Sequence, residues 1–151
     1  CLIERSELTS GSTWHAAGGF HTLNADPNMA ALQGYTIKLY KELEALTGLN
    51  CGLHHVGGIT LADSPERMDF IKAARAMHRH MGLDTHIISP EEIKKLSPIV
   101  NTQGILGALY DPLDGHLDPS GTTHAYAKAA QIQGAEIDLR NPVTDLKQRP
   151  D

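Results

Sequence analysis

Residues 2–19 read LIERSELTSGSTWHAAGG, and the first four of them are typical of the end of a buried strand. In a dinucleotide-binding βαβ unit, the acidic residue that ends the second strand accepts hydrogen bonds from the adenosine ribose. Glu4 stands in the corresponding position, whereas the GxGxxG turn of such a unit would precede residue 1. The alternative is an ordinary strand whose last two residues are charged because the strand reaches solvent there. This segment alone leaves open whether Glu4 binds a ribose.

The loop that follows, GSTWHAAGG at residues 11–19, has little with which to build a core, because only Trp14 among its side chains is large and apolar. Its glycines permit a positive φ angle or a close approach to another group, and its serine and threonine are small donors suited to phosphate or ribityl oxygens. The alternative is a helix start in which His15 is an ordinary surface or core histidine. The acidic strand end followed by this glycine-flanked turn favours a bound group.

Composition narrows the possible classes of protein. Of 151 residues, 40% are apolar and 21% charged, and 13 basic against 18 acidic residues give a formal net charge of −5, so no nucleic acid partner is expected. No apolar run approaches the roughly 18 residues of a spanning helix, and no membrane insertion is expected. Cys1 and Cys51 are too few for a disulfide framework, and we expect free, buried thiols. A bacterial cytoplasm or a mitochondrial matrix suits such a chain.

Four Asp-Pro or Ser-Pro pairs mark the starts of four helices, because the first residue can cap the helix and proline fits its first turn. A capping box is expected where Glu92 follows Ser89. The alternation of helices and strands predicts an α/β arrangement. The predicted helices span residues 26–48, 64–82, 89–98 and 118–134, and the predicted strands span 58–62, 85–89, 104–110, 135–139 and 143–147.

Apolar residues recur at steps of three and four in the first two helices, which predicts one inward face on each. In the helix at 64–82 this face comprises Met68, Ile71 and Met77. In the helix at 26–48 it comprises Met29, Leu32, Tyr35, Leu39, Leu43 and Leu46.

The stretch LIERSELTSGSTWHAAG at residues 2–18 resembles the dimethylglycine and sarcosine dehydrogenases, which are FAD-dependent amine oxidoreductases of the D-amino-acid-oxidase-like group. Other segments resemble the same family in the same order: PERM at 65–68, GALYDPLDGHLDPSGTTHAYAKAA at 107–130, and GAEI followed by NPVTDL near the end. The resemblance covers essentially the whole chain and implies that it is an internal fragment of a longer enzyme.

The implied fold class is α/β, a fragment of an FAD-binding Rossmann-like domain with an inserted mixed-sheet α+β substrate domain. Residues 1–48 would form part of the FAD-binding domain, comprising the end of its second strand, the flavin-attachment loop and a helix. Residues 49–112 would belong to the substrate domain, and residues 113–151 would return to the FAD-binding domain.

The resemblance also implies how the cofactor is held. In this family the histidine of the TWHAAG stretch bonds covalently to the 8α-methyl carbon of the flavin ring, which makes His15 the attachment site. An imidazole there withdraws electron density and raises the flavin's reduction potential. Glu4 and Arg5 would contact the adenosine end, and the backbone of Val143 the adenine side. The remaining residues of the cofactor loop would be Gly11, Ser12, Thr13, Trp14, Ala16, Ala17, Gly18 and Gly19.

The implied reaction is the oxidative demethylation of an N-methyl amine such as dimethylglycine. A hydride passes from the methyl carbon to flavin N5 and leaves an iminium, whose one-carbon unit goes to water or, in a full-length parent, to tetrahydrofolate. Electron-transfer flavoprotein or oxygen would be the electron acceptor. GFHTLNADPN at 19–28 departs from mammalian members and leaves the amine open. Two alternatives remain: a sarcosine or other secondary-amine or amino-acid oxidase with non-covalent FAD, and a non-catalytic relative.

The other histidines give no metal site by their spacing. His54 and His55 would point to opposite faces of a strand, while His78 and His80 diverge by about 200° on a helix. His116 in the DGHLDP turn and Tyr110 are weak candidates for catalysis, although for His116 stabilisation of the turn is the simpler interpretation. The catalytic base stays unassigned.

Overall fold

The computed structural model describes residues 1–22, 24 and 26–148 as a mixed α/β structure. The chain divides into two compact units, each with a core of its own. Unit 1 comprises Cys1–Gly18, Lys38–Leu53 and Leu117–Asp151, and unit 2 comprises Gly19–Ile37 and His54–His116. The three-part division at residues 48 and 112 is not tested by these units and stays a prediction about the parent enzyme.

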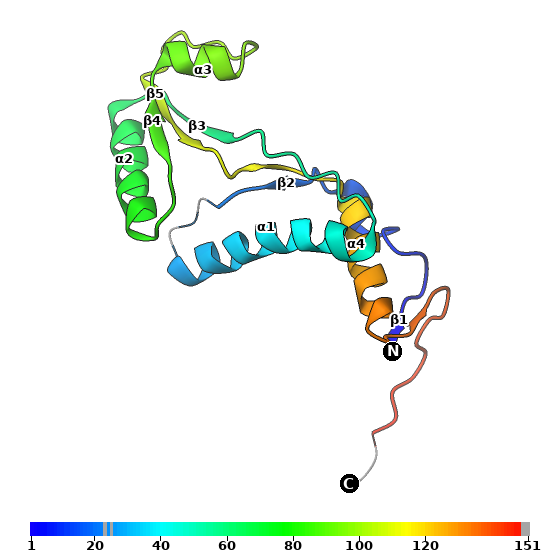
Figure 1. Ribbon diagram of the computed structural model, residues 1–151. Coiled ribbons are helices and arrows are strands. Elements are labelled where there is room, and N and C mark those ends of the chain that lie inside the picture. The colour runs from blue at the N-terminus through cyan, green and yellow to red at the C-terminus, as the bar shows by residue number, and fades with distance from the viewer. Residues whose placement is uncertain (23, 25, 149–151) are drawn as a thin grey trace. The chain divides into compact units, whose positions relative to one another are not determined.

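Unit 2 is built on a three-stranded antiparallel sheet in the order β3-β5-β4, labelled in Figure 1. Its strands are β3 (Gly58–Ala62), β5 (Gly107–Asp111) and β4 (His86–Ile88). The short strands β2 (Gly19–Phe20) and β6 (Gly115–His116) pair antiparallel in the same unit. Three of the predicted strands therefore form this sheet; β3 has the predicted bounds, and the ends of β4 and β5 are shifted by one to three residues.

Side-chain alternation along the strands gives the sheet two apolar faces. Helix α2 (Pro65–His80) covers one of them, where Ile71 is fully buried against Leu109 and Ala62. Ile93 of α3 (Pro90–Leu96) is buried on the other, against Ile88 and Ala108. Because neighbouring residues of a strand point to opposite faces, Ala108 and Leu109 serve different cores.

Unit 1 contains helix α4 (Pro119–Ile132), the 3-10 turn η1 (Ser12–His15), and the part of helix α1 (Pro27–Thr47) that follows Ile37. Its small core joins Leu43 and Cys51 to Ala125 and Ala129 of α4. Strand β1 (Leu2–Ile3) pairs in parallel with β7 (Ile137–Asp138). Alanine on α4 lets the facing segments approach closely, because a methyl group takes little room.

The predicted helix starts are confirmed, and their caps explain why. Ser64 Oγ accepts a hydrogen bond from the Arg67 amide, and Ser89 with Glu92 forms a complete capping box. Asp118 Oδ1 accepts from the Ser120 amide at 2.9 Å. These bonds satisfy amides that the first turn of a helix leaves without an internal partner.

Sequence predictions are wrong at several places in the described structure. Leu2 and Ile3 are about half exposed (50% and 48%), so they are not the end of a buried strand, and Cys1 is exposed whereas Cys51 is buried. Residues 143–147 form no strand, because no neighbouring strand pairs with their backbone. On α1, four of the six residues assigned to the inward face are exposed: Met29, Leu32, Tyr35 and Leu46.

The buried residues of α1 are Ala30, Ile37 and Leu43; Leu43 belongs to the predicted face, whereas Ala30 and Ile37 lie on a different stripe. Periodicity identifies a helix face that is apolar but not the surface that will cover it. Of the helices within residues 1–22 and 26–148, none combines the length and the apolar character that crossing a bilayer requires.

Candidate flavin site

The centre of the candidate site is the turn η1, which directs two large side chains outward. Gly11 precedes the turn and its carbonyl accepts a hydrogen bond from the Trp14 amide at 3.3 Å, while the Thr13 carbonyl accepts from the Ala16 amide at 3.1 Å. Ala16 then takes an extended conformation (φ −74°, ψ 135°), which ends the turn. The chain thus makes one tight turn whose last residue is His15.

Both large side chains of the turn are open to solvent. Trp14 is 73% exposed, and the His15 imidazole is exposed without a hydrogen-bond partner among the described residues. His15 is therefore not a core histidine, and its ring nitrogens are free to react. Exposed indole beside two exposed alanines, Ala16 and Ala17, offers apolar surface against which a planar ring can pack.

Gly18 anchors the turn to the start of α4. The Leu117 amide donates to the Gly18 carbonyl at 2.9 Å, and a Cβ on Gly18 would lie 2.2 Å from the Leu117 carbonyl oxygen. Its φ angle of +76° is also one that other residues rarely adopt. The requirement for glycine at residue 18 is thus explained by packing within the chain. Gly11 and Gly19, in contrast, have open space where a Cβ would stand.

Glu4 lies in a backbone network at the end of β1. Its amide donates to the Asp138 carbonyl at 2.8 Å, and its carbonyl accepts from the Asn141 amide at 3.0 Å. One carboxylate oxygen, Oε1, accepts from the Ser6 amide at 2.7 Å, which orients the side chain. Oε2 has no partner among the described residues and is available to a hydroxyl group.

Unit 1 contains most of the residues predicted to bind the cofactor: Glu4, Arg5, Val143 and residues 11–18. Arg5 and Val143 are exposed. Gly19 and both weak catalytic candidates belong to unit 2. The assignment of these residues to the cofactor stays a prediction.

The two weak candidates for catalysis, Tyr110 and His116, make contacts within unit 2 that are consistent with a purely structural role. The Tyr110 ring occupies the space beside Gly57, where a Cβ would meet its Cε2 at 2.4 Å. The backbones of His116 and His54 exchange two hydrogen bonds of 2.8 and 3.0 Å, and their ring centroids are 4.9 Å apart. Among residues 1–22, 24 and 26–148, no group of three or more potential ligands could hold a metal ion.

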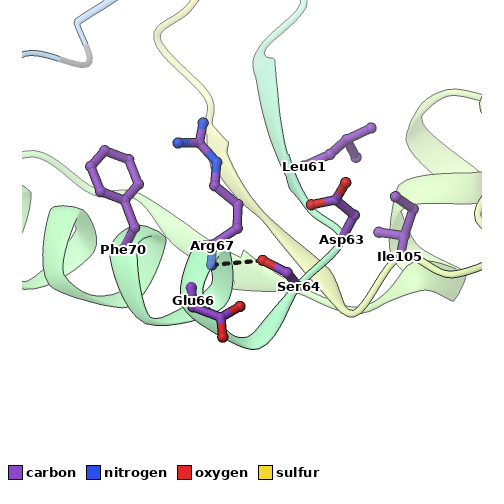
Figure 2. Close-up of a pocket in the computed structure, with 7 residues that line it drawn as sticks. All are labelled: Leu61, Asp63, Ser64, Glu66, Arg67, Phe70 and Ile105. Carbon is purple, nitrogen blue, oxygen red and sulfur yellow. Dashed lines mark hydrogen bonds between the residues drawn. The ribbon is translucent and has the colours of Figure 1, made fainter.

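A separate pocket of about 610 Å³ opens in unit 2, where β3 leads into α2 (Figure 2). The Arg67 guanidinium lies 4.6 Å from the Phe70 ring centroid, and Asp63 and Glu66 add two carboxylates. No residue predicted to contact the flavin lines this pocket. The lining residues are Leu61, Asp63, Ser64, Glu66, Arg67, Phe70 and Ile105.

Sequence reasoning missed a polar cluster in unit 2 that comprises the buried Thr22 and Asp111 and the half-buried Asp114. The Thr22 hydroxyl donates to Asp111 and its amide donates to Asp114. No motif indicates this cluster, because Thr22 lies about 90 positions before its partners and only the fold brings them together.

The fold and the exposed histidine turn are consistent with a flavoprotein, and comparison with known proteins identifies the family. The family model "DAO: FAD dependent oxidoreductase" matches residues 1–151, and the chain therefore belongs to the FAD-dependent oxidoreductases of this family. The resemblance drawn from residues 2–18 and the α/β fold class are both confirmed.

Particular relatives are mitochondrial enzymes. Dimethylglycine dehydrogenase of Rattus norvegicus is 43% identical over 150 residues, which cover 99% of this chain and 18% of that protein. Sarcosine dehydrogenase of Homo sapiens is 37% identical over 147 residues, covering 97% of this chain and 16% of that protein. This chain thus spans less than a fifth of the length of either relative.

Among solved structures, the L-proline dehydrogenase of P. horikoshii shares the fold. The two superimpose with a TM-score of 0.89 at 24% sequence identity, over 98% of this chain and 39% of that one.

Proposed function

We propose that this chain is the flavin-attachment part of an enzyme that oxidatively demethylates an N-methyl amino acid, with dimethylglycine as the preferred substrate. The observation that carries the proposal is the exposed, unpartnered imidazole of His15 beside Trp14, on a turn that Gly18 anchors to α4. An exposed imidazole nitrogen without a hydrogen-bond partner is available to form a bond to a cofactor.

The residues around the turn fit FAD in their chemistry. Trp14 and the two alanines after His15 supply exposed apolar surface for a planar ring. The hydroxyls of Ser12 and Thr13 have no partner among the described residues and can donate to ribityl or phosphate oxygens. The free Oε2 of Glu4 can accept from a ribose hydroxyl.

Different residues of the chain hold different parts of the cofactor in this proposal. His15 holds the cofactor through one imidazole nitrogen, Glu4 and Arg5 contact the adenosine end, and Val143 contacts the adenine side through its backbone. When bound, FAD supplies the two-electron acceptor for the C–H bond of the N-methyl group. In the parent enzyme, electron-transfer flavoprotein or oxygen then takes the electrons, and water or tetrahydrofolate takes the one-carbon unit. The mitochondrial matrix, or the cytoplasm of a bacterium, is the proposed location.

Acid precipitation of the full-length flavoprotein tests the proposed attachment. Acid unfolds the protein and releases a non-covalent cofactor, so we expect the yellow colour to stay in the pellet and to follow one proteolytic peptide that contains His15. Flavin in the supernatant of an active enzyme would instead favour the non-covalent alternative. A parent protein that binds no flavin would favour the non-catalytic one.

A panel of amines tests the substrate. We expect kcat/KM for dimethylglycine to exceed that for sarcosine and for proline by about tenfold or more, which corresponds to about 1.4 kcal/mol of differential transition-state binding. The same measurement with oxygen and with an artificial electron acceptor reports which acceptor the enzyme uses. Equal or higher values for sarcosine would reassign the substrate while leaving the attachment in place.

A further inference from the structure

His54 and His116 lie directly opposite each other on two antiparallel segments of unit 2. The His54 amide donates to the His116 carbonyl at 2.8 Å, and the His116 amide donates to the His54 carbonyl at 3.0 Å. Side chains that stand opposite each other in an antiparallel pair lie on the same face of the ladder. The two imidazoles are therefore neighbours, although their spacing along the sequence gives no sign of it.

The two rings are spaced as two ligands of one metal ion are. Their centroids are 4.9 Å apart, and their planes are tilted by 37°. Two imidazoles that bind one Zn²⁺ at about 2.0–2.1 Å, with an angle of about 90–110° at the metal, have centroids about 4.5–5.3 Å apart. The observed separation lies within this range, so the backbone already holds the rings at the spacing that a shared ion requires.

Neither imidazole is occupied by another group of the protein. Both side chains are exposed, and within residues 1–22, 24 and 26–148 no hydrogen bond or ion pair involves their ring nitrogens. In contrast, Nδ1 of His55 and Nδ1 of His78 each contact an oxygen of the chain, at 3.1 and 3.3 Å. A neutral imidazole has one ring nitrogen with a free lone pair, and this is the atom that binds a metal. The pair thus offers two unused metal ligands on one face.

The surroundings of the pair leave room for an ion. Gly19 of β2 stands opposite His116 on its other side, and no atom lies within 4 Å of the position of a Cβ on Gly19. The next residues of the ladder point to the other face, where the rings of Phe20 and His55 meet edge to face with centroids 5.5 Å apart. The face that carries the two imidazoles therefore has space for the water molecules that complete the coordination of a metal.

We propose that His54 and His116 form a binding site for one divalent transition-metal ion such as Zn²⁺, held by two imidazoles and by water. Nitrogen ligands favour Zn²⁺, Ni²⁺ and Cu²⁺, whereas Mg²⁺ and Ca²⁺ prefer oxygen ligands. Within the described part of the chain no third protein ligand joins the pair, so the ion exchanges with the solvent. This inference does not rest on the proposed amine oxidation.

A bound ion stabilises the pairing of the two segments. The rings meet only across the ladder, so the ion binds the paired arrangement and not the separated strands. Binding to one of two arrangements favours that arrangement by the factor 1 + [metal]/Kd. Strand β6, which contains His116, also pairs with β2, and β2 directly follows the loop predicted to bind the flavin. The metal therefore holds a segment that is bonded to the residues after this loop.

Calorimetric titration of the full-length protein, without a histidine tag, tests the site with ZnCl₂ as the probe. At about pH 7.5, where imidazole is available to a metal, we expect one Zn²⁺ to bind with a Kd of about 0.1 mM or tighter. His116→Gln leaves a single imidazole and should weaken this binding by about tenfold or more, because even the loss of a group that orients a ligand costs that much. His55→Gln removes an exposed histidine on the other face and should keep the wild-type affinity.

Hydrogen exchange of the His54 and His116 amides provides a second measurement, since these amides form the ladder. At a Zn²⁺ concentration ten times Kd, their protection should rise about tenfold, whereas the same concentration of Mg²⁺ should leave it unchanged. If His116→Gln fails to fold, His54→Gln removes the other ligand and serves the same purpose.

Two results would overturn the proposal: wild-type protein that binds no Zn²⁺ in this range, or wild-type affinity in His54→Gln or His116→Gln. Protection of the ladder amides that does not respond to Zn²⁺ would likewise place the ion elsewhere and contradict it. Flavin retention after acid precipitation is measured on the same samples, so failure of the metal site is distinguishable from failure of the proposed function.

Discussion

Replacing His15 by alanine is expected to abolish covalent flavin retention in the full-length enzyme, from essentially all of the bound flavin to none. Alanine has no nitrogen that could bond to the 8α-methyl carbon. His15 is exposed and makes no hydrogen bond to another described residue, so its loss should leave the fold intact. Flavin absorbance in the acid pellet, and the mass of the peptide that contains residue 15, measure the effect.

An exposed histidine in unit 2 provides the control for this variant. His80→Ala, at the end of α2, removes the same side chain and should keep all flavin in the pellet. If His15→Ala retained covalent flavin, attachment at His15 would be wrong. His15→Ala should still bind FAD reversibly, and the reduction potential of that complex should lie below the wild-type value, because the electron-withdrawing imidazole is gone.

Replacing Gly18 by alanine is expected to destabilise unit 1 by about 3 kcal/mol, the sum of a strained positive φ angle and a clash with the backbone. The φ angle is +76°, and the new Cβ would stand 2.2 Å from the Leu117 carbonyl oxygen, which cannot move without shifting the start of α4. Native-state hydrogen exchange of α4 in the full-length protein measures this loss. Flavin content should fall with it, since the anchor of the cofactor turn is lost.

The neighbouring glycine separates this effect from a general sensitivity of the loop. No atom lies within 4 Å of the position where a Cβ on Gly19 would stand, and its φ angle is not in the left-handed region. Gly19→Ala should therefore change stability by no more than about 0.5 kcal/mol. Equal losses in the two variants would contradict the role assigned to the contact between Gly18 and Leu117.

Helix starts were predictable because their causes are local. The side chain of Ser64, Ser89 or Asp118 reaches an amide two or three residues further along the chain, so the bond depends on sequence neighbours alone. The family was predictable for a related reason, since the resemblance rests on contiguous segments such as residues 2–18.

Which apolar faces become buried could not be predicted from local sequence in the same way. Residues 143–147 are predicted to form a strand, yet Val143 and Leu146 are exposed, because a strand requires a partner whose backbone bonds lie elsewhere in the chain. Met29 and Leu32 of α1 show helical periodicity, but the buried stripe of that helix runs through Ala30 and Ile37.

The amino-acid sequence by itself determined the family, the starts of the four α-helices and the three strands of the main sheet, because short-range bonds and contiguous motifs specify them. Only the tertiary structure decided that His15 is exposed on a turn anchored by Gly18, and that Thr22 joins two acids on the β5–β6 turn. Exposure and long-range hydrogen bonds depend on which distant segments meet, and no local pattern records that.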